Sequence, residues 1–183
     1  MIGDVRYPAK IFELWSKAEL NAIGIYEVIT DSTNKKDEAY YNNTNEQYNF
    51  ADNQVTRSWG IATPKRLEDE NAVDENGENN LDEDGNQVIN YGLKTEKKRI
   101  VKQQASGLLA PTDWYVVKAT EVADYSVPEN VTTFRSDVRA KSNEMETQID
   151  ACTNVDELKA LYEYTEQEDG TITRPLAEFP KEI

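Results

Sequence analysis

The stretch from Leu93 to Trp114 reads Leu-Lys-Thr-Glu-Lys-Lys-Arg-Ile-Val-Lys-Gln-Gln-Ala-Ser-Gly-Leu-Leu-Ala-Pro-Thr-Asp-Trp, and the fold is decided here. Pro111 cannot continue a helix and disfavours helical angles at Ala110, so we expect a helix that ends near Leu109. Thr112 and Asp113 would then form a turn, and Trp114 would open a short apolar run and pack in the core. The apolar residues before the proline recur at helical spacing and form one stripe: Ile100, Val101, Ala105, Leu108 and Leu109.

A second apolar stripe follows Pro128, a residue that suits the first turn of a helix. The stripe could be a coiled-coil seam or the buried face of an antiparallel hairpin with the helix before Leu109. Lys141 interrupts the seam, which favours the hairpin. A short helix starting at Thr153 and an extended, docking tail that includes Phe179 are expected after it. The stripe keeps nearly heptad spacing: Val131, Phe134, Val138, Met145, Ile149 and Cys152.

The N-terminal residues predict a smaller, β-rich unit. Ser16 and Glu19 form a capping box at the start of a short helix, Trp15 can pack against its first turn, and Gly24 suits a left-handed cap at its end. Residues 25–29 favour a strand, and runs 46–50 and 54–59 favour a β-hairpin around 51–53. One face of that hairpin should carry Tyr48, Phe50, Val55 and Trp59.

Between Glu68 and Asp84 stand nine acidic residues and no basic one. The simpler interpretation is a solvated loop with a hairpin turn at 84–86, leading into a strand at 87–91. The alternative is a calcium loop, because Asn80-x-Asp82-x-Asp84-Gly85 matches the first half of the EF-hand pattern. Tyr91 stands where that loop needs glutamate, so we expect at most weak cation binding at 80–85. We expect no internal repeat in the chain.

Composition narrows the classes of function. The 183 residues are 38% hydrophobic and 30% charged, less apolar and more charged than a typical globule. The net charge of −15 argues against nucleic acid and against an anionic membrane surface as partners. No apolar run is long enough to span a bilayer, and no N-terminal signal segment is recognisable.

Reactive side chains are scarce. The single cysteine, Cys152, excludes an intramolecular disulfide, and its position on an apolar stripe predicts a small core residue rather than a reactive thiol. The absence of histidine removes the usual general base and the commonest metal ligand. Carboxylates remain, but in a stretch that nothing rigidifies. We therefore expect no enzyme, no catalytic residue, no metal and no cofactor.

Lys97-Lys98-Arg99 is a basic trio on the outer face of the predicted central helix. A solvated helix face is the simpler interpretation, since most charge runs on helices have no partner. Docking onto the acids of a neighbouring subunit is the functional alternative.

Together these patterns predict an α+β protein in three parts. Residues 1–66 would form the β-rich unit with a short helix and hairpins, and residues 67–92 the acidic loop and hairpin. Residues 93–183 would form the antiparallel helical hairpin, followed by a short helix and an extended tail.

Three patterns carry a resemblance to proteins of tailed bacteriophages. Trp15-Ser16-x-x-Glu19-Leu20-x-x-x-Gly24 before a strand looks like the N-terminal part of small tail proteins. Leu108-Leu109-x-x-Thr112-Asp113-Trp114, followed by a helix with Phe134-Arg135 and Arg139, resembles the C-terminal part of tail-fibre assembly and fibre-accessory proteins. The ending Pro175-Leu176-x-x-Phe179-Pro180 is similar to their Trp-Pro endings, with Phe in place of Trp. The acidic insertion at 74–84 is a departure from that family.

The resemblance implies a structural protein of the phage tail, fibre or baseplate apparatus, made in the host cytoplasm and located in the virion. Its partners would be other tail or fibre proteins, and it would be assembled in several copies. A tail-fibre assembly chaperone absent from the mature virion is the alternative, although the missing terminal Trp departs from that pattern. The family has no active site to carry over.

Overall fold

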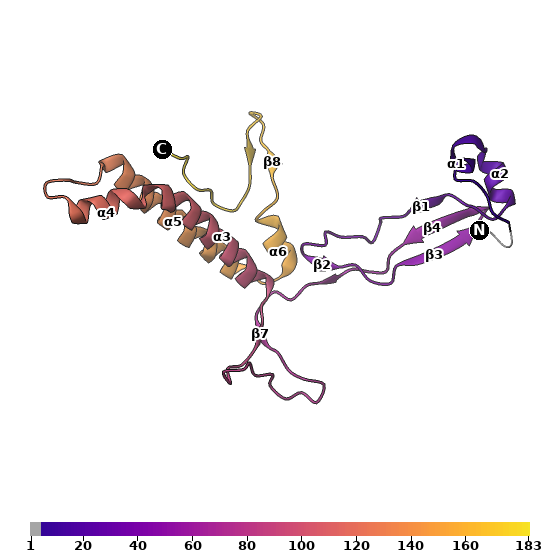
Figure 1. The fold of residues 1–183 in the computed structure, drawn as a ribbon, viewed down its shortest axis with the longest axis horizontal. Helices are drawn as coiled ribbons and strands as arrows, with labels where there is room; N and C mark the ends of the chain where they lie inside the picture. Colours follow the sequence, from indigo (N-terminus) through magenta and orange to yellow (C-terminus); the bar gives the residue numbers. More distant parts are fainter. Residues whose placement is uncertain (1–4) are drawn as a thin grey trace. The chain divides into compact units, whose positions relative to one another are not determined.

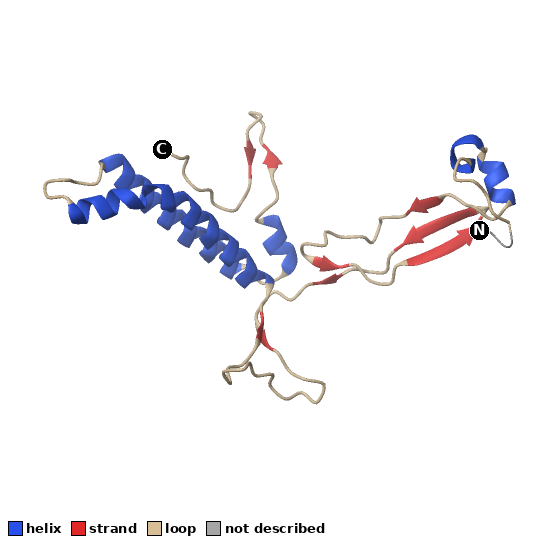
Figure 2. Ribbon diagram, viewed as in Figure 1, coloured by secondary structure: helices blue, strands red, loops and turns tan. Residues whose placement is uncertain are grey.

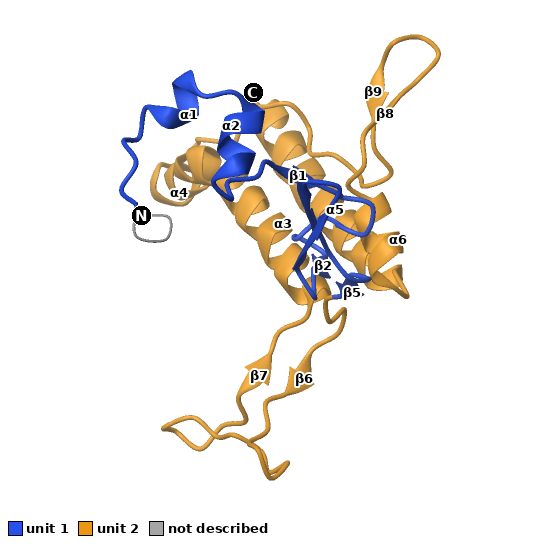
Figure 3. Cartoon of the chain, turned by 90° about the vertical axis from the view of Figure 1, so that its right-hand side faces the viewer, with its two compact units in different colours: residues 1–64 blue, residues 65–183 orange. Residues whose placement is uncertain are grey.

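A computed structural model describes residues 5–183 and shows an α+β chain, as predicted (Figures 1 and 2). The chain divides into two compact units, Met1–Pro64 and Lys65–Ile183, distinguished by colour in Figure 3. The acidic segment predicted as a separate part therefore belongs to the second unit, together with the helices. In the part of the chain that the structure describes, no helix is both long and apolar enough to cross a bilayer.

The first unit opens with helices α1 (Ile11–Leu14) and α2 (Lys17–Ala22). Ser16 and Glu19 form the predicted capping box: the Ser16 N–H donates to Glu19 Oε2 at 2.8 Å, and the Glu19 N–H donates to Ser16 Oγ at 3.3 Å. Gly24 has φ of 83°, and the Ile25 N–H donates to the Leu20 carbonyl at 3.0 Å, closing the helix as predicted. Because the Ile25 N–H takes part in this helix cap, the strand that we expected from residue 25 begins only at Val28.

The strands of the first unit form a three-stranded sheet and a separate two-stranded one. In the larger sheet the predicted hairpin, β3 (Gln47–Ala51) and β4 (Gln54–Ser58), is joined by β1 (Val28–Thr30), which runs parallel to β4. Asp52 and Asn53 make the turn with φ of 51° and 61°, the left-handed pair that a tight hairpin requires. The smaller sheet pairs β2 (Tyr41–Asn42) with β5 (Thr63–Pro64).

The second unit begins with a stem, β6 (Glu70–Asn71) paired with β7 (Ile89–Asn90), that ends in two small loops. The loops repeat an eight-residue pattern, Val73-Asp-Glu-Asn-Gly and Leu81-Asp-Glu-Asp-Gly, which contradicts our expectation of no repeat. Three residues eight apart join stem and loops in a ring of backbone hydrogen bonds. Ala72 donates to Val88 (2.8 Å), Val88 to Asn80 (2.9 Å), and Asn80 to Ala72 (2.9 Å).

Helices α3 (Leu93–Leu109) and α5 (Glu129–Ala151) pack against each other as the predicted helical hairpin. The apolar stripe of α5 is buried as expected, and Ser142 rather than Lys141 fills the gap in it. Val101 and Ala105 of α3 are buried, but Ile100 is 43% exposed, because each residue turns a helix by about 100° and Ile100 stands one position aside.

Pro111 ends α3 as predicted, but the chain does not turn into an extended run. Residues Ala110–Thr112 form one 3₁₀ turn, η1, and helix α4 (Asp113–Glu121) follows at once. Proline is tolerated in the first turn of a new helix, where its missing N–H costs nothing.

The C-terminal part folds back onto the helices of the same unit. Asn154 caps helix α6 (Val155–Ala160), and the chain continues through β8 (Thr165–Glu166) and β9 (Ile172–Thr173). Gln148 of α5 then holds the tail, because its side chain donates to the Pro175 carbonyl (3.0 Å) and accepts from the Ala177 N–H (2.8 Å). Leu176 between them is buried, so the tail docks as expected.

Candidate interaction surface

Arg135 of α5 fixes the bend between α3 and α4. Its Nη1 donates to the Leu109 carbonyl at 3.1 Å and to Thr112 Oγ1 at 2.5 Å, and it lies 2.8 Å from Asp113 Oδ1. The Thr112 hydroxyl also donates to Leu109 at 2.7 Å. Only 11% of the Arg135 side chain is exposed. One largely buried guanidinium therefore ties α5 to the turn between α3 and α4.

Beneath this bend lies an apolar cluster that joins the two helices and the tail. Ala105, Phe134 and Val138 are buried in it, and Leu108, Leu109 and Phe179 pack against it half-buried. The structure thus brings together six predicted residues from distant parts of the sequence: Leu108, Leu109, Thr112, Asp113, Phe134 and Phe179. These residues hold the end of the hairpin in place.

Trp114 does not belong to that cluster. Half of its surface is exposed, and α4 has no buried residue at all, so the prediction that Trp114 is a core residue was wrong. The reason is the helical path after Pro111: it turns Thr112 toward the core, 6% exposed, and the residues after it outward.

Helix α4 and the loop after it expose several apolar side chains. We call Trp114, Val116, Val117 and Val122 the α4 surface; they are 41–51% exposed. Tyr115 stacks on Trp114 with ring centroids 3.8 Å apart, and the Lys118 ammonium lies 4.3 Å from the Tyr125 ring and 5.7 Å from that of Trp114. The aromatic side chains are therefore held in fixed positions before any partner arrives.

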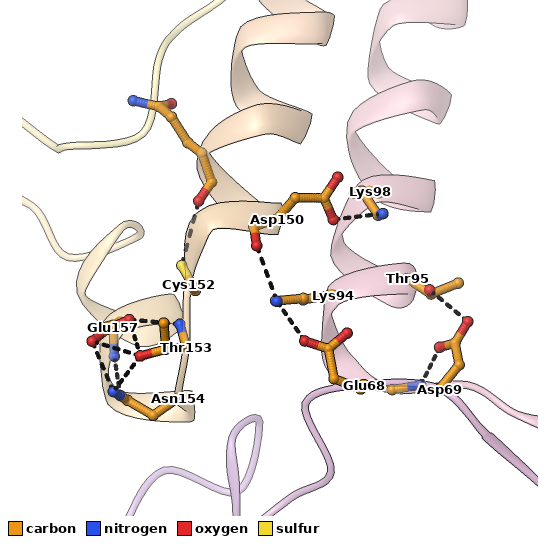
Figure 4. A network of polar contacts seen from close by, with 12 residues as sticks. Glu68, Asp69, Lys94, Thr95, Lys98, Asp150, Cys152, Thr153, Asn154 and Glu157 are labelled. Atoms are coloured by element: carbon orange, nitrogen blue, oxygen red, sulfur yellow. Dashed lines mark hydrogen bonds and ion pairs between the residues drawn. The ribbon is translucent and has the colours of Figure 1, made fainter.

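The opposite end of the hairpin is closed by polar contacts, shown in Figure 4. Lys94 Nζ bridges Glu68 Oε1 (2.5 Å) and the Asp150 carbonyl at the end of α5 (3.0 Å). Asp69 accepts from the Gly92 N–H (2.7 Å) and from Thr95 Oγ1 (2.9 Å), capping α3 from outside the helix. A methyl group on Gly92 would lie 2.4 Å from the Glu68 backbone, so only glycine fits there.

Two carboxylates of the acidic loops accept hydrogen bonds from backbone N–H groups of their own loops. Asp74 accepts the N–H groups of Asn76 and Glu78, and Asp82 those of Asp84 and Asn86, at 2.8–3.0 Å. These hydrogen bonds lower the pKa of both carboxyls, that from Glu78 most for Asp74 and that from Asn86 most for Asp82. Among residues 5–183 no three acidic or cysteine side chains converge as metal ligands. The backbone hydrogen bonds of Asp82 and the φ of 82° at Gly85 show the turn that the simpler interpretation of this segment predicts.

The basic trio is largely engaged within its own unit. Lys98 pairs with Asp150 at 2.7 Å, which raises the pKa of the lysine, and Lys97 lies 4.9 Å from the Tyr162 ring. An open pocket of about 510 Å³ lies along this side of α3, lined by Tyr91, Thr95, Glu96, Lys98, Arg99 and Lys102. Lys102 pairs with Glu146 at 3.2 Å, which leaves the pocket little net positive charge. The trio is therefore not the solvated outer face of the simpler interpretation, because Lys97 and Lys98 contact residues of their own unit and only Arg99 is exposed.

The remaining predicted residues lie in the first unit and belong to its short helices. Trp15 packs edge-on against Tyr7, with ring centroids 5.7 Å apart, beside the capping box of Ser16 and Glu19. Cys152, in the second unit, is buried as predicted, and burial raises its pKa. Sequence reasoning missed the contacts of Arg135, because its partners Leu109, Thr112 and Asp113 lie more than 20 residues earlier and no local pattern indicates them.

Comparison of the chain with models of protein families, with curated proteins and with solved structures finds no match in any of the three.

Proposed function

We propose that this chain is a structural component of a bacteriophage tail, fibre or baseplate, and that it acts by binding other proteins of that apparatus. The phage part of the proposal rests on the sequence resemblance. The mode of action is supported by one observation: an aromatic, apolar helix surface stands uncovered at the end of a braced hairpin.

The α4 surface has the composition of a protein-binding site. Tryptophan contributes more than most residues to interface energy, and valines around it exclude water. Isolated apolar residues on a surface need no explanation, but several large apolar residues in and just after one helix that buries none of its residues do. Arg135 holds the helix at a fixed bend, so little conformational entropy is lost on binding.

The partner would be another protein of the tail apparatus, and the acidic charge of the second unit would limit contacts elsewhere. Residues 65–183 hold 26 acidic and 14 basic residues. Such an excess disfavours association with other acidic surfaces and leaves the uncharged α4 surface as the adhesive region.

The test is made in phage particles. A phage whose own copy of the gene is deleted is complemented with the wild-type chain or with Trp114→Ala, and infectious particles are counted. We expect Trp114→Ala to lower the count at least tenfold. Tyr164→Ala, which removes an aromatic 60% exposed outside α4, should leave it unchanged.

Mass spectrometry of purified virions addresses location. Abundant peptides of the chain in the particle support a virion component, and their absence, with particles that still depend on the gene, supports the chaperone alternative. Wild-type yield from both the deletion and Trp114→Ala would refute the proposal.

A further inference from the structure

One asparagine of the acidic loops is followed by glycine, and this pair has a reactivity of its own. Asn76-Gly77 is the only Asn-Gly step in the chain. The backbone nitrogen of the residue after an asparagine can attack the side-chain carbonyl carbon of that asparagine. A side chain on the attacking residue hinders this approach, and glycine has none. Asn76 is therefore the asparagine of this chain at which the attack meets least hindrance.

The structure leaves this pair open to water. Asn76 and Gly77 are exposed, in a loop at the end of the stem that projects from the helices of the second unit (Figure 3). Gly77 has φ of 82°, and a Cβ built on it would meet nothing within 4 Å. Nothing therefore crowds the attacking residue, and water reaches the amide that it attacks.

We propose that Asn76 is a site of spontaneous deamidation. The Gly77 nitrogen bonds to Cγ of Asn76 and loses its proton, and the C–N bond of the side-chain amide breaks, so that its nitrogen leaves as ammonia with that proton. Water then opens the cyclic imide at either carbonyl carbon, with the hydroxyl going to the carbon and the hydrogen to the nitrogen. The products are aspartate and isoaspartate at position 76. No atom is oxidised or reduced, and water is the only other reactant.

The second acidic loop shows that the aspartate product fits. In the eight-residue repeat Asp84 occupies the position of Asn76, and the glycine after each has φ of 82°. Asp82 accepts the Asp84 N–H at 3.0 Å, as Asp74 accepts the Asn76 N–H at 2.8 Å. Deamidation to aspartate therefore changes Asp-Glu-Asn-Gly of the first loop into Asp-Glu-Asp-Gly, the sequence of the second.

The isoaspartate product does not fit the same turn. Its main chain runs through the former side chain, which adds one methylene to the backbone at residue 76. Two hydrogen bonds close the turn around this residue: the Glu78 N–H donates to Asp74 Oδ1 at 2.9 Å, and the Asp74 N–H donates to the Glu78 carbonyl at 2.8 Å. Isoaspartate should break both bonds and open the first loop, while the second stays closed.

Asp74 controls the rate of the reaction. Its carbonyl accepts the Gly77 N–H at 3.1 Å, and its Oδ2 accepts from Nδ2 of Asn76 at 3.3 Å. One residue thus holds both the nucleophile and the leaving group. Its negative carboxylate also disfavours the anion that forms when the Gly77 N–H loses its proton. These contacts slow the reaction but do not prevent it, because hydrogen bonds in an exposed loop open locally.

The inference does not rest on the phage assignment, and its test uses the purified full chain. The chain is kept at mildly alkaline pH, which favours loss of the N–H proton, and samples are digested with trypsin over time. Mass spectrometry of the peptide 67–94 should show the mass gain of an amide exchanged for a carboxylate at residue 76. Asn79 and Asn80 in the same peptide precede larger residues and should stay intact.

Isoaspartate is distinguished from aspartate by enzymatic methylation of its free α-carboxylate, and this signal should grow with the mass gain. Asn76→Gln is the matched control, because the longer side chain forms a cyclic imide far more slowly. It should show neither the mass gain nor the methylation. A wild-type chain in which Asn76 stays intact would overturn the proposal.

Two variants test the role of Asp74. Asp74→Ala removes the carboxylate from the first loop and should raise the rate at Asn76 about tenfold, a factor within the worth of hydrogen bonds to a charged group. Asp82→Ala makes the same change in the second loop and should leave that rate as in the wild type. Both residues lie outside the helices, so the helical circular dichroism should stay the same. Equal rates in the two variants would overturn the control by Asp74.

Discussion

Arg135 shows how one side chain can join a helix to a bend that lies far away in the sequence. Its guanidinium contacts the Leu109 carbonyl, Thr112 and Asp113 while remaining almost completely buried. Arginine suits this task because its planar fork presents several donors in fixed directions, whereas lysine offers a single compact charge.

We expect Arg135→Met to lower the free energy of unfolding by about 1–3 kcal/mol, because it removes the hydrogen bonds to the Leu109 carbonyl and to Thr112 while keeping much of the side-chain volume. Urea denaturation followed by circular dichroism measures the change. Arg99→Met, on the exposed side of α3, is the control and should change stability by less than about 0.5 kcal/mol. Equal losses in the two variants would contradict the role given to Arg135.

Asp74 and Asp82 carry a second prediction at the residue scale. Their folded-state pKa values are lowered by backbone N–H donors, so each carboxylate stabilises its loop at pH above the ordinary aspartate pKa. The stabilisation is lost as the pH falls through the lowered pKa. In an NMR titration the amide protons of Glu78 and Asn86 should shift at a pH below that typical of aspartate.

Asp82→Asn is the matched control for this titration. It should abolish the shift of Asn86 and leave that of Glu78, because each carboxylate serves only its own loop. If both amides titrate together in the wild type at an ordinary aspartate pKa, the loops are not held in this way.

At the scale of elements, two glycines of the central helix region have opposite roles. Gly92 stands at the start of α3, where the backbone of Glu68 approaches too closely for any side chain. Gly107 lies within α3, and a Cβ added there would meet nothing within 4 Å. The first is required by packing between elements, and the second is only a weak helix former.

The same substitution should therefore have opposite signs at the two positions. Gly92→Ala should destabilise the second unit by at least about 1 kcal/mol, since the stem must shift to admit a methyl group. Gly107→Ala should stabilise it by about 0.5–1 kcal/mol. Thermal unfolding of the two variants and of the wild type measures both changes in stability. A Gly92→Ala chain as stable as the wild type would refute the steric argument.

At the scale of the whole molecule, the second unit has a hydrophobic core of its own, as a separate domain requires. Its helical hairpin, α6 and the tail share buried residues, among them Val138, Met145, Ile149, Leu158 and Leu176. By contrast, the sheet of the first unit buries none of its strand residues. The two units should therefore depend differently on other chains.

We expect a fragment comprising residues 65–183 to keep its helices and to stay monomeric. Far-ultraviolet circular dichroism should show the helical signal of the same residues in the full chain, and sedimentation should give one chain. A fragment that loses its helical signal would show that the hairpin needs residues 1–64, contrary to the division into two compact units.

Local sequence patterns determined much of this protein. The capping box at Ser16, the left-handed Gly24, the hairpin turn at Asp52-Asn53 and the buried stripe of α5 depend on neighbours in the chain, so the sequence alone predicts them. The α+β class and the helical hairpin follow from the same patterns. The eight-residue repeat was present in the sequence too, but was missed because its two loops differ at most positions.

Only the tertiary structure decided the path of the chain after Pro111 and which side chains there are buried. After Pro111 the chain resumes a helix, and Arg135, 24 residues later, contacts the bend; this path sends Trp114 outward and Thr112 inward. The exposed strands of the first unit have the same cause: alternation along a strand places side chains on one side but cannot say what, if anything, packs against that side. Burial depends on contacts between residues far apart in the sequence, and these exist only once the chain has folded.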